Sequence, residues 1–148
     1  MAARGIRNNN PGNIDFNPRN KWQGQLGLEL DVPRPRFARF DSPENGIRAM
    51  AKLILNYRGK DGMPGLGKPG IDTITEIINR WAPGHENDTA AYIRAVSQDT
   101  GFKADASLAL ADPKVLTPVV YSIIHHENGS NPYDAEVVKE GVRRALEG

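Results

Sequence analysis

A glutamate, Glu127, stands at the end of an apolar helical pattern in the last quarter of the chain. Ile123 and Ile124 precede it by four and three residues, so the three side chains should share one helix face. Gly129 is a typical helix terminator, and Pro132 prevents continuation. A carboxyl group at the rim of a hydrophobic core loses water, which raises its pKa and suits a general acid near neutral pH. The alternative is a solvated glutamate, although helix C-termini disfavour acidic groups.

Metal and nucleophile chemistry have less support in the sequence. The chain has no cysteine, and its histidines are His85, His125 and His126. Neighbouring histidines cannot chelate one ion as an i, i+4 pair would, and neither a His-Glu-x-x-His pattern nor a Gly-x-Ser-x-Gly elbow occurs. We therefore expect no metal and no cofactor. His125 and His126 should pack or hydrogen-bond near the carboxylate, and His126 could tune its proton affinity.

Amide and aromatic side chains around the glutamate suit a carbohydrate ligand. Asparagine and glutamine hydrogen-bond sugar hydroxyl and acetamido groups, while tyrosine and tryptophan pack on the faces of sugar rings. The residues that could supply such groups are Asn10, Asn13, Trp81, Tyr92, Asn128, Asn131 and Tyr133.

Composition narrows the functional class. A chain of 148 residues suits one domain, 1–148, and a formal net charge of +1 gives no argument for nucleic acid as a partner. The basic run Arg34–Arg39 is either solvated surface or a contact for an anionic polymer such as a cell wall. The N-terminus lacks the apolar core of a signal peptide, and no apolar run is long enough to span a membrane, so we expect no membrane insertion.

Residues 1–41 are rich in Asn, Pro, Gly and Arg and have little helical periodicity. They should form loops, including the turn Asn8–Asn13, and two short strands around Trp22–Leu30 and Arg36–Phe40. A helix should then begin after Ser42 and run to about Tyr57, because Ser42 is a good N-cap and apolar residues follow at helical spacing. The Gly/Pro-rich segment Gly59–Gly70 is expected to be a lid or plain connection.

Further helices should follow in the second half of the chain. One covers Ile74–Trp81 and ends at Pro83-Gly84, and the next is capped by Asp88 and stops near Gly101. Asp112-Pro113 opens another, which Pro118 should kink or restart with Thr117 as its cap before it ends at Glu127. Asp134 should cap a last amphipathic helix. The expected fold class is mainly α, with a small irregular or β lobe at its N-terminal end.

Several segments resemble lytic transglycosylases and goose-type lysozymes. Glu127–Pro132 is similar to the Glu-Ser-x-x-Asn-Pro segment around the catalytic glutamate of that family. Ser42–Leu53 resembles the family's "Asn-Ile-x-Ala-Gly-x-x-Tyr-Leu" segment. Ile78–Gly84 stands where the family has "Ala-Ala-Tyr-Asn-Ala-Gly", and Thr89–Val96 resembles its "Thr-x-x-Tyr-Val-x-x-Val" segment. The whole assembly, from Arg4-Gly5-Ile6-Arg7 to Glu127-Asn128-Gly129, also resembles small peptidoglycan-degrading or virion-associated proteins of bacteriophages.

The order of these segments differs from that of the family, in which the catalytic glutamate comes first. Here it comes last, so the resemblance implies a circularly permuted lysozyme-like domain in which Arg7–Ile14 stands in for the family's "Gly-Leu-Met-Gln" segment. Permutation is physically reasonable where chain termini lie close together at the surface.

The resemblance implies a substrate, the β-1,4 bond between N-acetylmuramic acid and N-acetylglucosamine in peptidoglycan. Glu127 would be the catalytic acid and base of a transglycosylase that forms 1,6-anhydromuramic acid, with Tyr92 orienting Glu127 or the sugar. The substrate-binding residues would be Asn10, Asn13, Trp81, Asn128, Asn131 and Tyr133.

Two alternatives stay open at this point. One is a hydrolytic muramidase with a second carboxylate, for which Glu44 is the most visible candidate, although Glu44 is also a normal first-turn helix residue. The other is a noncatalytic phage virion or cell-wall-binding protein. The enzyme would act from the virion, with other phage virion proteins as partners, or from the host cytoplasm after delivery to the periplasm.

Overall fold

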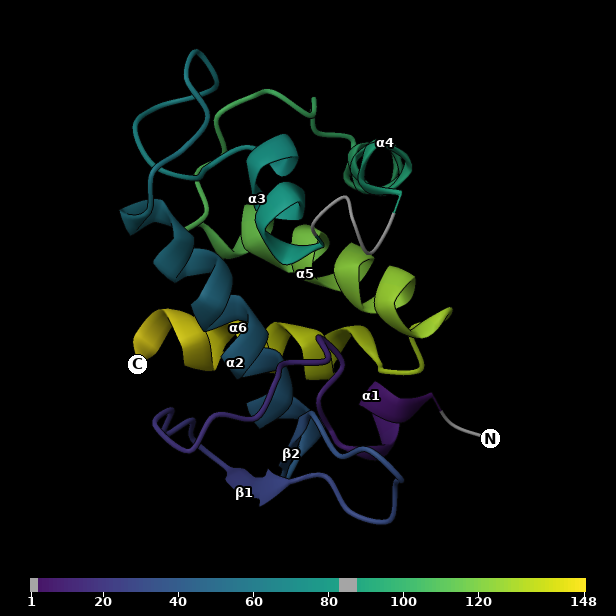
Figure 1. Ribbon diagram of the computed structural model, residues 1–148. Helices are drawn as coiled ribbons and strands as arrows, with labels where there is room; N and C mark the ends of the chain where they lie inside the picture. Colours follow the sequence, from purple (N-terminus) through teal and green to yellow (C-terminus); the bar gives the residue numbers. More distant parts are fainter. Residues whose placement is uncertain (1–2, 83–87) are drawn as a thin grey trace.

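The chain folds into a mainly helical structure with a small antiparallel sheet near its N-terminal end (Figure 1). The computed structural model describes residues 3–82 and 88–148. The strands are β1 (Gln25–Leu28) and β2 (Ala38–Phe40), and a 3₁₀ turn, Tyr57–Gly59, follows α2. The helices are α1 (Arg4–Arg7), α2 (Pro43–Asn56), α3 (Ile74–Trp81), α4 (Thr89–Thr100), α5 (Pro113–Asn128) and α6 (Ala135–Glu147). The expected mainly α class with a small β lobe is confirmed.

Helix α2 begins where its capping residue predicts. The Ser42 hydroxyl accepts a hydrogen bond from the Asn45 N–H at 3.2 Å, and Pro43 occupies the first helical position. Ile47, Met50 and Ile54 are fully buried, which places one face of α2 in the core as their spacing predicts. The predicted segment Gly59–Gly70 is largely loop.

Helices α3 and α4 also have defined starts. Thr73 and Glu76 form a capping box at α3, which was not predicted from the sequence. Asp88 accepts from the Ala91 N–H at 3.1 Å at the start of α4, and Gly101 ends it in a left-handed conformation with φ of 77°. Both ends of α4 are as predicted, while the predicted end of α3 at Pro83-Gly84 lies outside the described residues.

Helix α5 corrects one prediction: it runs from Pro113 to Asn128 as one helix and does not restart at Thr117, while a kink at Pro118 stays a prediction. Pro118 lacks the N–H that would bond the carbonyl four residues earlier, which normally disfavours a helix interior. Leu116 and Val119 on either side are fully buried, so core packing favours the continuous helix. In α6, Asp134 occupies the predicted N-cap position, but its side chain makes no capping hydrogen bond.

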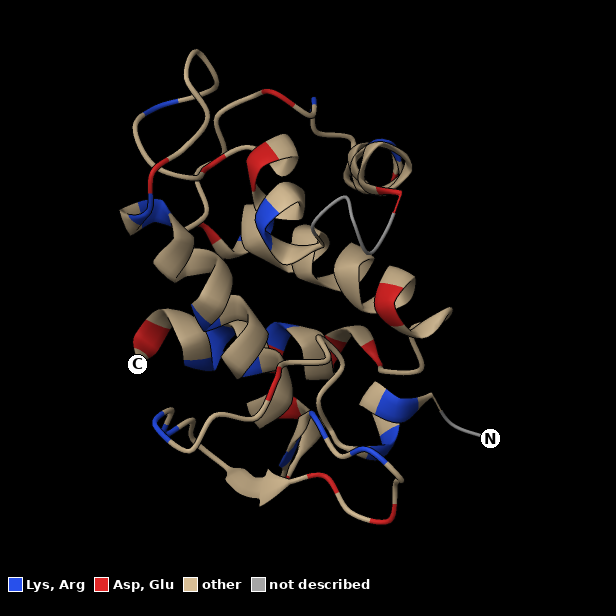
Figure 2. Ribbon diagram, in the orientation of Figure 1, with Lys and Arg blue, Asp and Glu red and all other residues tan. Residues whose placement is uncertain are grey.

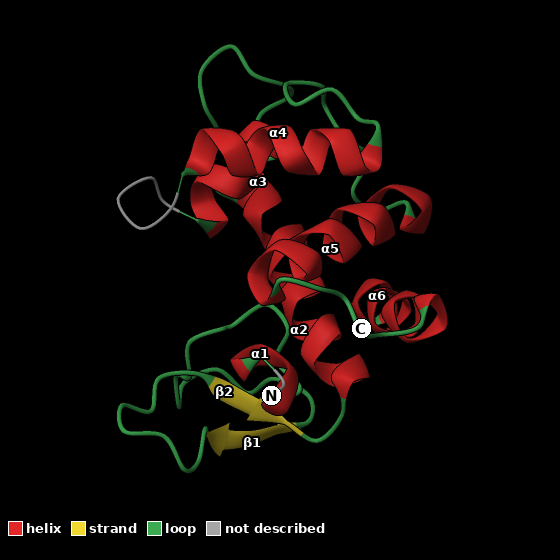
Figure 3. Cartoon of the chain, turned by 90° about the vertical axis from the view of Figure 1, so that its right-hand side faces the viewer, coloured by secondary structure: helices red, strands yellow, loops and turns green. Residues whose placement is uncertain are grey.

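The helices build a core around α5. Figure 3 shows α5 between the α3/α4 pair at one end of the molecule and α1 with the sheet at the other, and α6 packs beside α2 and α5. The fully buried side chains include Ile47, Met50, Ile77, Ile78, Val119, Ile123, Ile124 and Val142. No described helix is long and apolar enough to cross a membrane.

The sheet is small, and the turn Asn8–Asn13 fastens it to α2. Strands β1 and β2 are shorter than the predicted segments, with a register shift between Gln25 and Gly27. The Phe40 N–H donates to the Asn8 carbonyl at 2.8 Å. A Cβ at Gly46 would overlap the Asn9 carbonyl, so this glycine allows the turn to lie directly on α2.

Candidate active site

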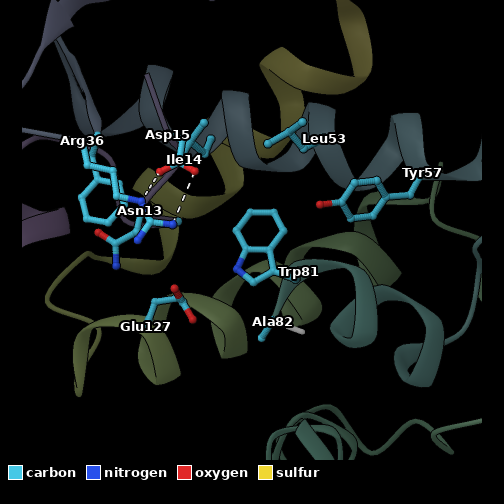
Figure 4. A pocket seen from close by; sticks show the side chains of 11 residues that line it. Asn13, Ile14, Asp15, Arg36, Leu53, Tyr57, Trp81, Ala82 and Glu127 are labelled. Carbon is cyan, nitrogen blue, oxygen red and sulfur yellow. Dashed lines mark hydrogen bonds and ion pairs between the residues drawn. The ribbon is translucent and has the colours of Figure 1, made fainter. Parts of the chain in front are cut away.

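Glu127 lies in the last turn of α5, where the buried face of the helix meets a cavity (Figure 4). Ile123 and Ile124 are fully buried one turn earlier, as the helical spacing predicts. Glu127 itself is partly buried, and loss of water raises the pKa of its carboxyl group. Hydrogen bonds from Tyr92 and Asn13 and the charge of His126 oppose this rise without cancelling it.

Tyr92 reaches Glu127 from α4. Its hydroxyl donates to Oε2 of Glu127 at 3.1 Å, across 35 residues of sequence. Burial and then the nearby Glu127 charge raise the pKa of Tyr92, so the phenol stays protonated and remains a donor. The structure thus brings together the two residues expected to be catalytic.

Asn13 approaches Glu127 from the small lobe, residues 3–41 with α1 and the sheet, which lies opposite the helical lobe of residues 43–82 and 88–148. Its backbone has a φ of 50°, a left-handed conformation that asparagine tolerates, and its N–H donates to the Asn10 carbonyl at 2.9 Å. Its side-chain oxygen is buried without a hydrogen-bond partner among the described residues. Asn13 therefore presents polar atoms beside the carboxyl group that has a raised pKa.

The cavity between the two lobes has a volume of about 320 Å³, within the usual range for small-molecule sites. Figure 4 shows Trp81 of α3 and Tyr57 on one side and Arg36, Asp15 and Asn13 on the other, with Glu127 at the base. Gly12 makes room for the indole, because a Cβ there would lie 2.9 Å from Trp81 Cζ2. The residues that line the cavity are Gly12, Asn13, Ile14, Asp15, Arg36, Phe37, Leu53, Tyr57, Trp81, Ala82 and Glu127.

Asn10 does not reach the cavity surface, contrary to its expected substrate-binding role. It is fully buried, and its amide nitrogen donates to the carbonyls of Ile14 and Ala38 at 3.0 and 2.8 Å. Its side-chain oxygen accepts from the Ile14 N–H at 3.0 Å. Asn10 is therefore a structural residue that joins the turn to β2.

Three further candidates also lie outside the cavity lining. Asn128 donates to the Pro11 carbonyl at 2.8 Å and so ties α5 to the turn. Asn131 accepts from the Tyr133 N–H at 3.0 Å within the loop before α6. The Tyr133 ring packs against the core, and burial raises its pKa to about 12. Their hydrogen bonds and packing support the fold near the site.

Several residues that line the cavity were not predicted from the sequence. Arg36 and Asp15 form an ion pair with an Nε–Oδ1 distance of 2.6 Å, and Phe37 lies beside them. The basic run Arg34–Arg39 gave a signal for Arg36, whereas a lone Asp15 in a loop gave none. Leu53 and Tyr57 lie within the helix predicted after Ser42, and helical spacing does not distinguish a cavity-facing side chain from a core one.

No group of three or more His, Cys, Asp or Glu side chains that could hold a metal ion occurs in residues 3–82 and 88–148. His85 lies outside the described residues. Figure 2 shows basic and acidic residues interspersed along most elements of both lobes. The lining of the cavity combines a carboxyl group of raised pKa, Glu127, with aromatic and amide side chains.

One curated relative of this chain is Protein P5 of Pseudoalteromonas phage PM2. The two sequences are 39% identical over 142 residues, which cover 95% of this chain and 80% of that protein. No family model matches the chain.

Proposed function

Given that the chain belongs to the family of Protein P5 of the bacteriophage PM2, we propose that it is a phage lytic transglycosylase that cleaves bacterial peptidoglycan. Its substrate is the β-1,4 bond from N-acetylmuramic acid to N-acetylglucosamine. The observation that carries the proposal is Glu127, a partly buried carboxyl group of raised pKa that accepts a hydrogen bond from Tyr92 and faces the cavity between the lobes.

The raised pKa supports a proton-transfer role for Glu127 in both directions. The protonated carboxyl group donates to the glycosidic oxygen, and the bond from that oxygen to muramyl C1 breaks as positive charge develops on the ring. The carboxylate then accepts the proton of the muramyl C6 hydroxyl while the C6 oxygen bonds to C1. The products are a 1,6-anhydromuramyl end and a free N-acetylglucosamine hydroxyl, and Glu127 is protonated again without a water molecule.

The cavity supplies groups that bind sugars. Trp81 offers an aromatic surface for a sugar ring, and Asn13 offers amide groups for hydroxyl or acetamido substituents. Tyr92 donates to Oε2 of Glu127, and with the hydrogen bond from Asn13 it orients the carboxyl group for proton transfer. Asn13 and Trp81 are the expected substrate-binding residues that line the cavity.

A permuted lysozyme-like domain is part of this proposal. In the permuted order, Arg7–Ile14 stands in for the segment that follows the catalytic helix of the family. This part of the chain contacts the end of α5, because the Asn128 amide donates to the Pro11 carbonyl across 117 residues of sequence. This contact supports the permuted order. The enzyme acts from the virion, or from the host cytoplasm after delivery to the periplasm, on glycan strands and without a cofactor.

Hydrolysis is the second candidate, because Asp15 places another carboxylate in the cavity wall. Glu44, the candidate from sequence, is absent from the cavity lining and lies in the first turn of α2. Asp15 is paired with Arg36 at 2.6 Å, which leaves it less free to activate water and favours the transglycosylase. A noncatalytic wall-binding protein, the third possibility, would have no need of the Glu127–Tyr92 pair.

The test is cleavage of purified peptidoglycan by the wild type, Glu127→Gln and the matched control Glu44→Gln. We expect Glu127→Gln to lose at least about 1,000-fold in rate, since it removes the acid and base together, and Glu44→Gln to keep wild-type activity. Circular dichroism checks that both variants fold. Equal rates for the wild type and Glu127→Gln would refute the site, and binding without cleavage by the wild type would favour the wall-binding protein.

A further inference from the structure

Asp99 of α4 joins that helix to α5 through two hydrogen bonds to one oxygen. The Ser122 hydroxyl donates to its Oδ2 at 2.7 Å, and Nε2 of His126 lies 3.1 Å from the same atom. These hydrogen bonds, with that of Ser122 the largest contribution, lower the pKa of Asp99, so its carboxylate stays ionised. Because an ionised carboxylate only accepts, His126 must carry a proton on Nε2.

His126 in turn lies against the tyrosine that bonds Glu127. The ring centroids of Tyr92 and His126 are 5.3 Å apart, with an angle of 48° between the ring planes. Tyr92 and Asp99 are seven residues apart on α4, about two turns, and so share a face that meets α5. The contacts therefore run without a break from Asp99 to His126, to Tyr92 and to Glu127.

We propose that His126, anchored by Asp99, is a positioning residue that holds the Tyr92 hydroxyl on Glu127. The catalytic consequence rests on the proposed function, while the positioning itself is a property of the fold. Tyr92 lies on α4 and Glu127 on α5, so their hydrogen bond depends on how these helices are held together. Asp99 fixes the His126 ring, and the ring restricts the movement of Tyr92.

The same residues do not form a nucleophilic triad. Ser122 is buried, and its hydroxyl donates to Asp99 rather than to a histidine. His125 also contacts the His126 ring edge-to-face, with a centroid distance of 5.3 Å, and the charge of His126 acts on Glu127 as well. Among the described contacts His125 forms no ion pair with Asp99, although its charge also helps to lower the pKa of that carboxyl group. It provides a histidine control on the same helix turn.

The variants separate the two contacts of His126. His126→Ala removes both, His126→Phe keeps a ring beside Tyr92, and His126→Gln keeps a donor for Asp99. In protein carrying ¹³C at tyrosine Cζ, we follow the Tyr92 resonance by NMR while Glu127 is titrated. This readout reports the Tyr92–Glu127 hydrogen bond directly and requires no activity.

In the wild type and His125→Gln, the Tyr92 Cζ resonance should follow the ionisation of Glu127. In His126→Ala the response should disappear, and in His126→Phe and His126→Gln it should be partly retained. A wild-type response in His126→Ala would overturn the inference. Wild type that shows the response but does not cleave would instead refute the proposed function.

With peptidoglycan as substrate, His126→Ala should lower kcat about tenfold, the value of one hydrogen bond of about 1.4 kcal/mol, and leave KM nearly unchanged. A general folding defect would lower the amount of active enzyme, which the thermal unfolding midpoint detects. An unchanged kcat in His126→Ala would contradict the role of the Asp99–His126 contact in catalysis.

Discussion

Glu29 anchors the cavity wall of the small lobe, and its replacement by glutamine should destabilise the protein. The side chain is 3% exposed and directs both oxygens at donors. Oε1 accepts from the Arg36 and Phe37 N–H groups at 2.8 and 3.1 Å and also from Arg4. Oε2 accepts from Arg4 Nε at 2.8 Å and from the Asn8 amide at 3.1 Å.

A glutamine cannot satisfy these donors, because one oxygen becomes an NH₂ group that faces N–H groups. The change loses at least one hydrogen bond to a charged acceptor, worth about 1.5–3 kcal/mol, and weakens the others by removing the charge. We therefore expect Glu29→Gln to lower the free energy of unfolding at pH 7 by about 3 kcal/mol. For a chain of this size, this corresponds to a fall of roughly 10 °C in Tm.

The effect should depend on pH in a defined direction. The hydrogen bond from Arg4, the largest cause, holds the pKa of Glu29 far below its usual range. A lowered folded pKa contributes stability that is present above the unfolded value of about 4.3 and is lost as the pH falls towards the folded value. The difference in the free energy of unfolding between wild type and Glu29→Gln should thus be largest at pH 7 and shrink below about pH 4.

Urea unfolding of both proteins from pH 7 to pH 2.5 measures this gap, with Glu136→Gln as the control. Glu136 has a side chain that is 85% exposed and pairs only loosely with Lys139 at 3.4 Å, so its replacement should change stability by less than about 0.5 kcal/mol. If Glu29→Gln were as stable as the wild type at pH 7, or the gap grew on acidification, this account of Glu29 would be refuted.

Two other substitutions test residues placed by the structure. Asn10→Ala removes three buried hydrogen bonds, so it should lower the free energy of unfolding by about 2–3 kcal/mol in urea. The control Asn56→Ala changes an exposed residue and should lower it by less than about 0.5 kcal/mol. Equal losses in the two variants would mean that Asn10 does not hold the turn. Trp81→Ala should raise KM for peptidoglycan about tenfold while Trp81→Phe keeps most of the affinity, and an unchanged KM in Trp81→Ala would remove the indole from the binding site.

Local sequence patterns predict the helices well where one residue decides the geometry. Ser42 and Asp88 cap their helices because the hydroxyl or carboxylate reaches a backbone N–H three residues later. The helical period likewise places Glu127 next to a buried face. Pro118 shows the limit, because the cost of a proline in a helix is local whereas the burial of Leu116 and Val119 that offsets it is tertiary.

The residues that line the cavity were harder to predict for the same reason. Asn10 and Asn13 belong to one turn, but Asn10 is the one whose amide reaches the carbonyl of Ala38, 28 residues further along the chain. Asp15 and Arg36 enter the cavity as a pair joined across 21 residues. No spacing rule within the sequence connects such residues, so their place in the site follows from the packing of the two lobes.

The most direct test of the central claim is mass spectrometry of the muropeptides that the wild type and Glu127→Gln release from purified peptidoglycan. We predict products that end in 1,6-anhydromuramic acid with the wild type and none with Glu127→Gln. Reducing muramic acid ends would contradict the water-free mechanism and point to hydrolysis, with Asp15→Asn as the next variant. Equal anhydro products from both proteins would contradict the assignment of Glu127.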